Sequence, residues 1–364
     1  MAAARDELPA WVDIGLIPSL NLTVALLVAG LVVIIIGESP LEALSILLNG
    51  ALGSLKGWGY LLYYATNFTF TGLAVAIAFH AGLFNIGGEG QVYMAGLGAA
   101  TVGLGLEFLP WPIALPLAIL ACMAVGAFWA LIPAYLQAKR GSHIVITTIM
   151  FNFIAASLMV YLINNVFRPA GRMAVESREI VSITMPSFRE IGMWLGVKLP
   201  NTPLNVTVFL AVVAAYGLWY LLWRTKLGYE IRTVGANVDA AIYAGIKPGR
   251  IIMVAMAISG GLAGLMAVNE VLGVQHRLVL EFAGGAGFVG IAVALMGRSH
   301  PVGVILAAML FGLLYQGGAE LSFAKPAITR DMIVVIQGLV ILFMGALEQA
   351  FRPLLAPIFF KLED

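Results

Sequence analysis

The sequence has little charge, one cysteine and few histidines, and each shortage excludes a class of function. Charged residues make up 11% of the 364 residues, whereas an ordinary soluble protein has about 25%. The single cysteine, Cys122, excludes an intrachain disulfide and a metal site built from cysteines. The four histidines are scattered and lack the spacing of a zinc site. The formal net charge of +1 argues against a nucleic-acid-binding protein.

Nucleotide-binding and catalytic motifs are missing as well. The sequence contains no G-x-x-x-x-G-K-[ST] loop, and no polar stretch is long enough for an ATPase domain. It shows no Ser/His/Asp grouping and no clustered acid–base or metal set. We therefore expect a chain that is not an enzyme and holds no cofactor of its own.

Apolar residues are what the sequence has in abundance. It is 61% hydrophobic, contains 41 glycines and has a mean hydropathy of +0.97. Apolar runs of about 20 residues recur, which is the length of a membrane-spanning helix, whereas a β-barrel would show short alternating segments. The start of the chain does not resemble a cleavable signal peptide, so the first apolar run is expected to remain as an anchor.

The fold class predicted from these runs is an all-α integral membrane protein with a single transmembrane domain over residues 1–364. We expect about ten spans, some of them broken by glycine, and one short cytoplasmic helix. The predicted spans are 18–37, 59–80, 84–106, 111–137, 144–166, 204–223, 251–272, 280–297, 302–319 and 332–347. Residues 41–58 are expected to form an interfacial helix or loop.

The polar loop 224–250 is the longest charged interruption that leads directly into a glycine-rich apolar run. Its pattern predicts a short helix from Asn237 to Ala244, with Asn237 as N-cap and Asp239 in the first turn. Gly245 is then a suitable residue to follow the helix, and Pro248 blocks its continuation. The alternative is a solvated loop whose cations obey the positive-inside rule.

This loop resembles the cytoplasmic coupling loop of permease subunits in bacterial ABC importers. The similarity lies in the string R-x-V-G-A-N-x-x-A-A-x-x-A-G-I-x-x-x-R, followed by S-G-x-x-A-G-L. It is closest to the branch that carries sugars, nucleosides and branched-chain amino acids. In that family the loop docks into a cleft on the ATPase subunit. The residues that the resemblance places in docking are Arg232, Gly235, Asn237, Asp239, Ala241 and Gly245.

A second unusual stretch, His80 to Ala100, combines Asn85, Glu89 and Gln91 with five glycines from Gly82 to Gly96. A carboxylate within a membrane segment usually faces a cavity or has a function, and glycines allow the backbone to break there. These three side chains are therefore candidates for the translocation path. The alternative is a polar cytoplasmic turn in which Glu89 is exposed to solvent. The string F-N-I-G-x-E-G-Q also resembles the nucleoside-type permeases.

Three further polar or flexible features are candidates for the same path. The run from Leu280 is rich in glycine, including Gly287, and corresponds in position to the first glycine-broken stretch, as in an internal repeat. Thr148 and Asn152 share one helix face, although polar residues on a span more often bond to neighbouring helices. Gln316 lies within the predicted span 302–319.

The remaining expectations concern orientation and partners. Segment 167–203 is predicted to be an extracytoplasmic loop on which a substrate-binding protein lands. With loop 224–250 inside, ten spans place both termini in the cytoplasm, and the cations of the short loops favour this orientation mildly.

The resemblance implies a multi-pass protein of the bacterial inner membrane, in contact with lipid. It pairs with a second homologous permease chain or a second copy, and with an ATPase subunit that holds ATP and Mg²⁺. The expected solute is a nucleoside, with ribose or galactose second and branched-chain amino acids third. A secondary carrier would need coupling acids deep in the spans, for which Glu89 is the candidate. A membrane enzyme is the third class.

Overall fold

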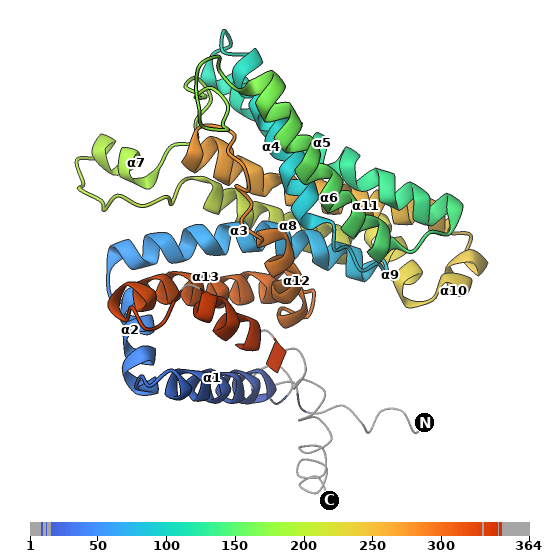
Figure 1. Cartoon of the computed structure of the whole chain (residues 1–364). Helices are drawn as coiled ribbons and strands as arrows, with labels where there is room; N and C mark the ends of the chain where they lie inside the picture. Colours follow the sequence, from blue (N-terminus) through green and yellow to red (C-terminus); the bar gives the residue numbers. More distant parts are fainter. Residues whose placement is uncertain (1–8, 10–11, 13–15, 330, 341, 344–364) are drawn as a thin grey trace, which may run out of the picture. The chain divides into compact units, whose positions relative to one another are not determined.

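A computed structural model describes residues 9, 12, 16–329, 331–340 and 342–343 (Figure 1). Within these residues the regular structure is helical, and pairing between extended segments is limited to two isolated bridges, Glu176 with Val279 and Ser187 with Asn205. The chain divides into two compact units. The larger unit is Trp58–Gly312, and the smaller combines the described parts of Met1–Gly57 and Leu313–Asp364.

The smaller unit contains α1 (Ile17–Ile35), α2 (Pro40–Leu52), the second half of α13 (Pro301–Ala324) and the helix Asp331–Val340. The chain turns by 116° between α1 and α2. Ser39 caps α2 by accepting a hydrogen bond from the backbone N–H of Glu42, and Pro40 follows as the first helical residue. Residues 41–58, expected to be an interfacial helix or loop, are therefore mostly α2 and the start of α3.

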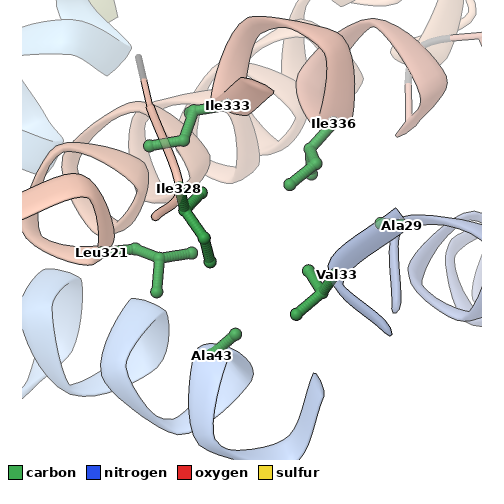
Figure 2. Close-up of a cluster of buried hydrophobic side chains, with 7 residues drawn as sticks. All are labelled: Ala29, Val33, Ala43, Leu321, Ile328, Ile333 and Ile336. Atoms are coloured by element: carbon green, nitrogen blue, oxygen red, sulfur yellow. The ribbon is translucent and has the colours of Figure 1, made fainter. Parts of the chain in front are cut away.

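A small apolar cluster holds this unit together. Figure 2 shows that its side chains come from α1, α2, the C-terminal helices and the turn between those helices, and that they point toward one another. Its members are Ala29, Val33, Ala43, Leu321, Ile328, Ile333 and Ile336. Lys325 forms ion pairs with Glu38 and Glu42 at 3.1 and 3.0 Å.

The larger unit carries most of the helices. They are most of α3 (Leu55–His80), α4 (Gly88–Gly105), α5 (Trp111–Arg140), α6 (Ile144–Leu162), α7 (Phe188–Trp194), α8 (Thr207–Arg224), α9 (Lys226–Ala236), α10 (Val238–Tyr243), α11 (Pro248–Ala267), α12 (Ala286–Met296) and the first half of α13. Helices α6 and α11 continue as π-helical segments over Ile163–Phe167 and Val268–Gln275.

Helices α5 and α11 pack backbone to backbone in the centre of this unit. A Cβ atom added to Gly260 would lie 2.3 Å from the carbonyl oxygen of Gly126, and one added to Gly264 would lie 2.4 Å from that of Cys122. Glycines four residues apart lie on one face of α11 and allow this close approach, which is the usual way that helices associate in lipid. The lone cysteine is thus part of a helix contact and is fully buried.

The predicted number of spans is not confirmed. Six helices are long and apolar enough to cross a membrane, or up to seven if the bent pair α1–α2 counts as one, among the described residues. Predicted span 280–297 contains α12, whose 11 residues reach about 16 Å, against about 30 Å for the hydrocarbon core. Predicted span 84–106 becomes helical at Gly88. For span 332–347, residues 341 and 344–347 lie outside the described residues.

Segment 167–203 is largely irregular and contains the short helix α7. Its backbone is hydrogen-bonded to the chain around the end of α11, from Ser177 N–H to Leu278 O at 2.9 Å and from Ile180 N–H to His276 O at 2.7 Å. Arg277 adds an ion pair with Glu176 at 2.9 Å. In Figure 1, α7 and α10 lie at opposite ends of the larger unit. The predicted outer loop, 167–203, and the predicted cytoplasmic loop, 224–250, are thus far apart.

Candidate functional site

The two glycine-broken stretches meet inside the larger unit, where the first turns of α4 and α12 touch. A Cβ atom added to Gly287 would lie 2.2 Å from the backbone nitrogen of Glu89. Gly285 precedes α12 with φ +80°, a conformation that glycine adopts without strain. Both helices therefore begin at this contact, which we call the half-helix junction. It comprises Asn85, Glu89, Gln91, Asn152, Ser259, Gly285 and Gly287.

Glu89 joins the two helix starts through its carboxylate. Its Oε2 accepts a hydrogen bond from the N–H of Gly287 at 2.8 Å, and its Oε1 accepts one from the N–H of Gly285 at 2.9 Å. The side chain is 4% exposed. The first N–H groups of a helix have no partner within the helix and carry partial positive charge. A buried carboxylate at this point satisfies them and is itself stabilised.

Asn85 and Gln91 form a reciprocal pair of amides beside Glu89. Each donates to the other's oxygen at 3.2 Å, and both are fully buried. Asn85 also donates to Ser259 of α11 at 2.9 Å and accepts the N–H of Gly87 at 2.8 Å. Ser259, which sequence reasoning missed, passes the network on to the carbonyl oxygen of Ala74 in α3. The signal for Ser259 was its place inside the S-G-x-x-A-G-L string.

Asn152 binds the backbone on both sides of the start of α4. It accepts the N–H of Gly90 at 2.9 Å and donates to the carbonyl of Ile86 at 2.9 Å. Thr148 is buried one turn earlier and donates to the carbonyl of Ile144 in its own helix. Asn152 therefore bonds α6 to a neighbouring segment, whereas the Thr148 hydroxyl bonds within its own helix.

Six of the seven residues predicted for the translocation path meet at or beside this junction. Gln316 does not, because it belongs to the smaller unit, where it donates to Glu320 at 3.2 Å. The six are held by bonds within the protein.

A second buried polar network lies on α3 and the π-helical end of α11. Glu270 accepts hydrogen bonds from the Tyr63 hydroxyl and from Asn67, the latter at 2.6 Å. Asn67 in turn accepts from Asn269 at 2.7 Å, and Asn269 accepts from Asn205 at 2.8 Å. Glu270 is 3% exposed. The four-residue spacing of Tyr63 and Asn67 is the sequence signal that these two side chains share one face of α3.

The predicted coupling helix is present as α10. The Asn237 side chain caps it by accepting the N–H of Ala240 at 2.9 Å. Asp239 lies exposed in the first turn, and Gly245 follows with φ +78°. The helix exposes apolar side chains, among them Tyr243 at 96% and Ile242 at 57%. Ala241 is fully buried, so it supports the helix from beneath.

Helix α9 lies between α8 and α10 in the chain and contacts the end of α3. The sequence analysis did not separate it from the loop. A Cβ atom on Gly235 would lie 2.2 Å from the carbonyl oxygen of His80 and 2.8 Å from the nitrogen of Gly82. Arg232 lies on the same helix, and its buried Nε has no hydrogen-bond partner within the described residues. Gly235 is therefore inside the contact with α3, and Arg232 lies on α9, so neither is on the exposed face of α10.

The end of α3 also contacts the end of α12. His80 Nε2 lies 3.1 Å from the carbonyl oxygen of Ser299, and its ring packs edge-on against Trp223 with the centroids 5.4 Å apart. Arg298 and Ser299 have φ angles of 50° and 54°, which side-chain-bearing residues rarely adopt. Two segments lead to the half-helix junction, residues 80–89 and α12. Their far ends, at His80 and Ser299, thus meet beside α9.

The described residues contain six helices that are long and apolar enough to cross a membrane, as in a multi-pass membrane protein. The family model described as branched-chain amino acid transport system / permease component matches residues 58–345. The chain belongs to this permease family.

Three relatives are similar over nearly the whole chain. The guanosine ABC transporter permease protein NupP of Bacillus subtilis is 34% identical, over 91% of this chain and 93% of its own. The nucleoside ABC transporter permease protein NupB of Lactococcus lactis is 31% identical, over 91% and 90%. The glucose ABC transporter permease protein TsgB13 of Haloferax volcanii is 33% identical, over 93% and 89%.

Family membership fixes the general function. The chain is an ABC transporter permease, a multi-pass inner-membrane protein that works with an ATPase and a substrate-binding partner.

Proposed function

We propose that this chain forms the translocation path of an importer for nucleosides. The observation that carries the proposal is its similarity to guanosine and nucleoside permeases over nine tenths of each chain. The similar identity to a glucose permease keeps simple sugars as the second candidate.

The half-helix junction favours an uncharged solute. Helix N-termini that meet inside a transporter commonly bind an anionic group of the solute. Here Glu89 supplies that anion from the protein itself. An anionic solute such as a nucleotide would be repelled, whereas a nucleoside or a simple sugar carries no charge to oppose Glu89.

The energy in this proposal comes from a partner ATPase that binds ATP and Mg²⁺ and docks on α10. Exposed Val238, Ile242 and Tyr243 give α10 an apolar surface suited to a cleft, and exposed Asp239 adds a charge at its start. Displacement of α10 and α9 is transmitted through Gly235 to His80 and Gly82. From there residues 80–89 and α12 both lead to Glu89. The junction therefore opens or closes with the ATPase.

We assign the substrate-binding protein to the end of the larger unit opposite α10. Segment 167–203, which is bonded to the chain entering α12, is the landing place for the substrate-binding protein. A second permease chain, identical or homologous, completes the path. In this orientation the end of the larger unit that carries α10 is cytoplasmic.

The docking assignment predicts that Asp239→Arg abolishes co-purification of the ATPase with the permease and lowers nucleoside uptake at least about tenfold. An arginine reverses the charge on the exposed first turn without touching a buried contact. The matched control is Glu179→Arg, an exposed charge in segment 167–203, which should leave ATPase binding unchanged. Normal ATPase binding and uptake by the Asp239→Arg transporter would show that α10 is not the docking element.

A further inference from the structure

The connection between the π-helical end of α11 and α12, residues 276–285, lies lengthwise on one face of α4. The residues of that face recur every three or four positions and are Glu89, Tyr93, Gly96, Ala100 and Gly103. Gly285 donates its N–H to the Glu89 carboxylate, and the Phe282 ring packs edge-on against Tyr93 with the centroids 5.8 Å apart. The connection therefore runs antiparallel to α4, outward from the half-helix junction.

Bulky side chains pack onto the glycines of this face. A Cβ atom on Gly96 would lie 2.5 Å from the Phe282 ring and 3.0 Å from Cδ1 of Leu278. A Cβ atom on Gly103, further out along α4, would lie 2.8 Å from Cγ2 of Ile180 in the predicted outer loop. Leu278 and Ile180 are fully buried, and Phe282 is 9% exposed. Apolar side chains thus cover the face of α4 that leads outward from the junction.

Hydrogen bonds join the connection to the predicted outer loop. The N–H of Ser177 donates to the carbonyl oxygen of Leu278 at 2.9 Å, and the Ser177 hydroxyl accepts the N–H of Leu278 at 2.9 Å. An ion pair of Arg277 reinforces this contact. Because of these bonds, a displacement of residues 176–180 also displaces residues 276–285. We call the two segments together the outer cover.

The inner end of the outer cover has the backbone of a hinge. Four of its residues have positive φ angles, and they are His276, Glu281, Gly284 and Gly285. A Cβ atom on Gly284 or on Gly285 would have no neighbouring atom of the described residues within 4 Å. Glycine changes its backbone angles at little steric cost, and hinges are a few loop residues that absorb such changes. The glycine pair is therefore the point at which the connection bends most easily.

We propose that the outer cover is the outer gate of the translocation path and that the substrate-binding protein opens it by displacing residues 176–180. In the closed gate, Phe282 and Leu278 occupy the face of α4 along which a solute from outside reaches Glu89. The bonds of Ser177 pass the displacement on to the connection, which bends at the glycine pair. This inference rests on the proposed function, because it takes the predicted outer loop as the landing place of the binding protein.

The test is a reversible disulfide between the outer cover and α4 in the full transporter, reconstituted with its ATPase and binding protein. Gly103→Cys with Ile180→Cys provides the two thiols. The Cβ atom of Ile180 is one bond beyond the contact at 2.8 Å, and a disulfide joins Cβ atoms about 3.5–4.5 Å apart. The background is Cys122→Ala, which removes the one natural cysteine. We expect ATP hydrolysis and guanosine uptake at least about tenfold slower in the oxidised protein than after reduction. Recovery on reduction shows that the chain is folded.

The matched control is Met123→Cys with Gly261→Cys in the same background. Their Cβ atoms would lie 3.9 Å apart between α5 and α11, and this disulfide should leave hydrolysis and uptake unchanged. A thiol-cleavable crosslinker gives the same two locks where a disulfide does not form.

The proposal is wrong if the locked outer cover hydrolyses ATP as fast as the reduced protein, or if the control lock inhibits as strongly. ATP hydrolysis is read without reference to the solute. Lack of guanosine uptake by the unmodified transporter therefore counts against the nucleoside assignment and not against the gate.

Discussion

Replacement of Glu89 by alanine should lower nucleoside uptake at least tenfold and destabilise the permease. The change leaves the N–H groups of Gly285 and Gly287 without their acceptors in a buried place. Each unsatisfied group costs about 1–3 kcal/mol, so the total is roughly 2–6 kcal/mol. That is a large part of the roughly 5–15 kcal/mol by which proteins are stable.

The measurement is thermal unfolding of the purified protein together with uptake of labelled guanosine. Glu107→Ala is the matched control, because Glu107 is an exposed carboxylate beyond the other end of α4. Glu89→Gln should fall between the two, since it keeps one oxygen acceptor. Unchanged unfolding temperature and uptake in Glu89→Ala would mean that the half-helix junction does not depend on this carboxylate.

The second large effect is expected from Gly235→Ala, which should uncouple ATP hydrolysis from transport. The added methyl would lie 2.2 Å from the carbonyl oxygen of His80, so α9 has to move away from the end of α3. The exposed face of α10 is untouched, and the ATPase should still bind and hydrolyse ATP. Uptake should fall at least tenfold because motion no longer reaches Gly82 and the junction.

The control for this variant is Gly249→Ala at the start of α11. Its added methyl would lie 3.6 Å from Ala138, an ordinary contact. The readouts are ATPase co-purification, ATP hydrolysis by the purified complex and uptake. If Gly235→Ala transports as well as Gly249→Ala, the contact between α9 and α3 does not carry the coupling.

Local signals in the sequence predicted the local structure well. Asn237 and Gly245 define the ends of α10 because capping depends on neighbouring residues. The apolar runs locate the long helices within a few residues, as for α5 at Trp111–Arg140 against the predicted 111–137.

What the sequence did not predict depends on distant contacts. Helix α12 is short because residues 276–285 before it form turns, which pack against segment 167–203 and against Gly96 of α4. Apolar periodicity does not encode these contacts. The bonds of Glu89 with residues nearly 200 positions away follow from the same arrangement. Gln316 looked equivalent to the other polar residues in spans, yet it belongs to a different unit.

We propose that this chain carries nucleosides with energy from an ATPase docked on α10. The most direct measurement is uptake of labelled guanosine by cells that lack the gene, with the unmodified gene or the Asp239→Arg gene restored. We predict loss of uptake in the deletion, recovery with the unmodified gene and no recovery with Asp239→Arg. Guanosine uptake that is the same with and without the gene, in cells in which no other guanosine importer is present, would contradict the account.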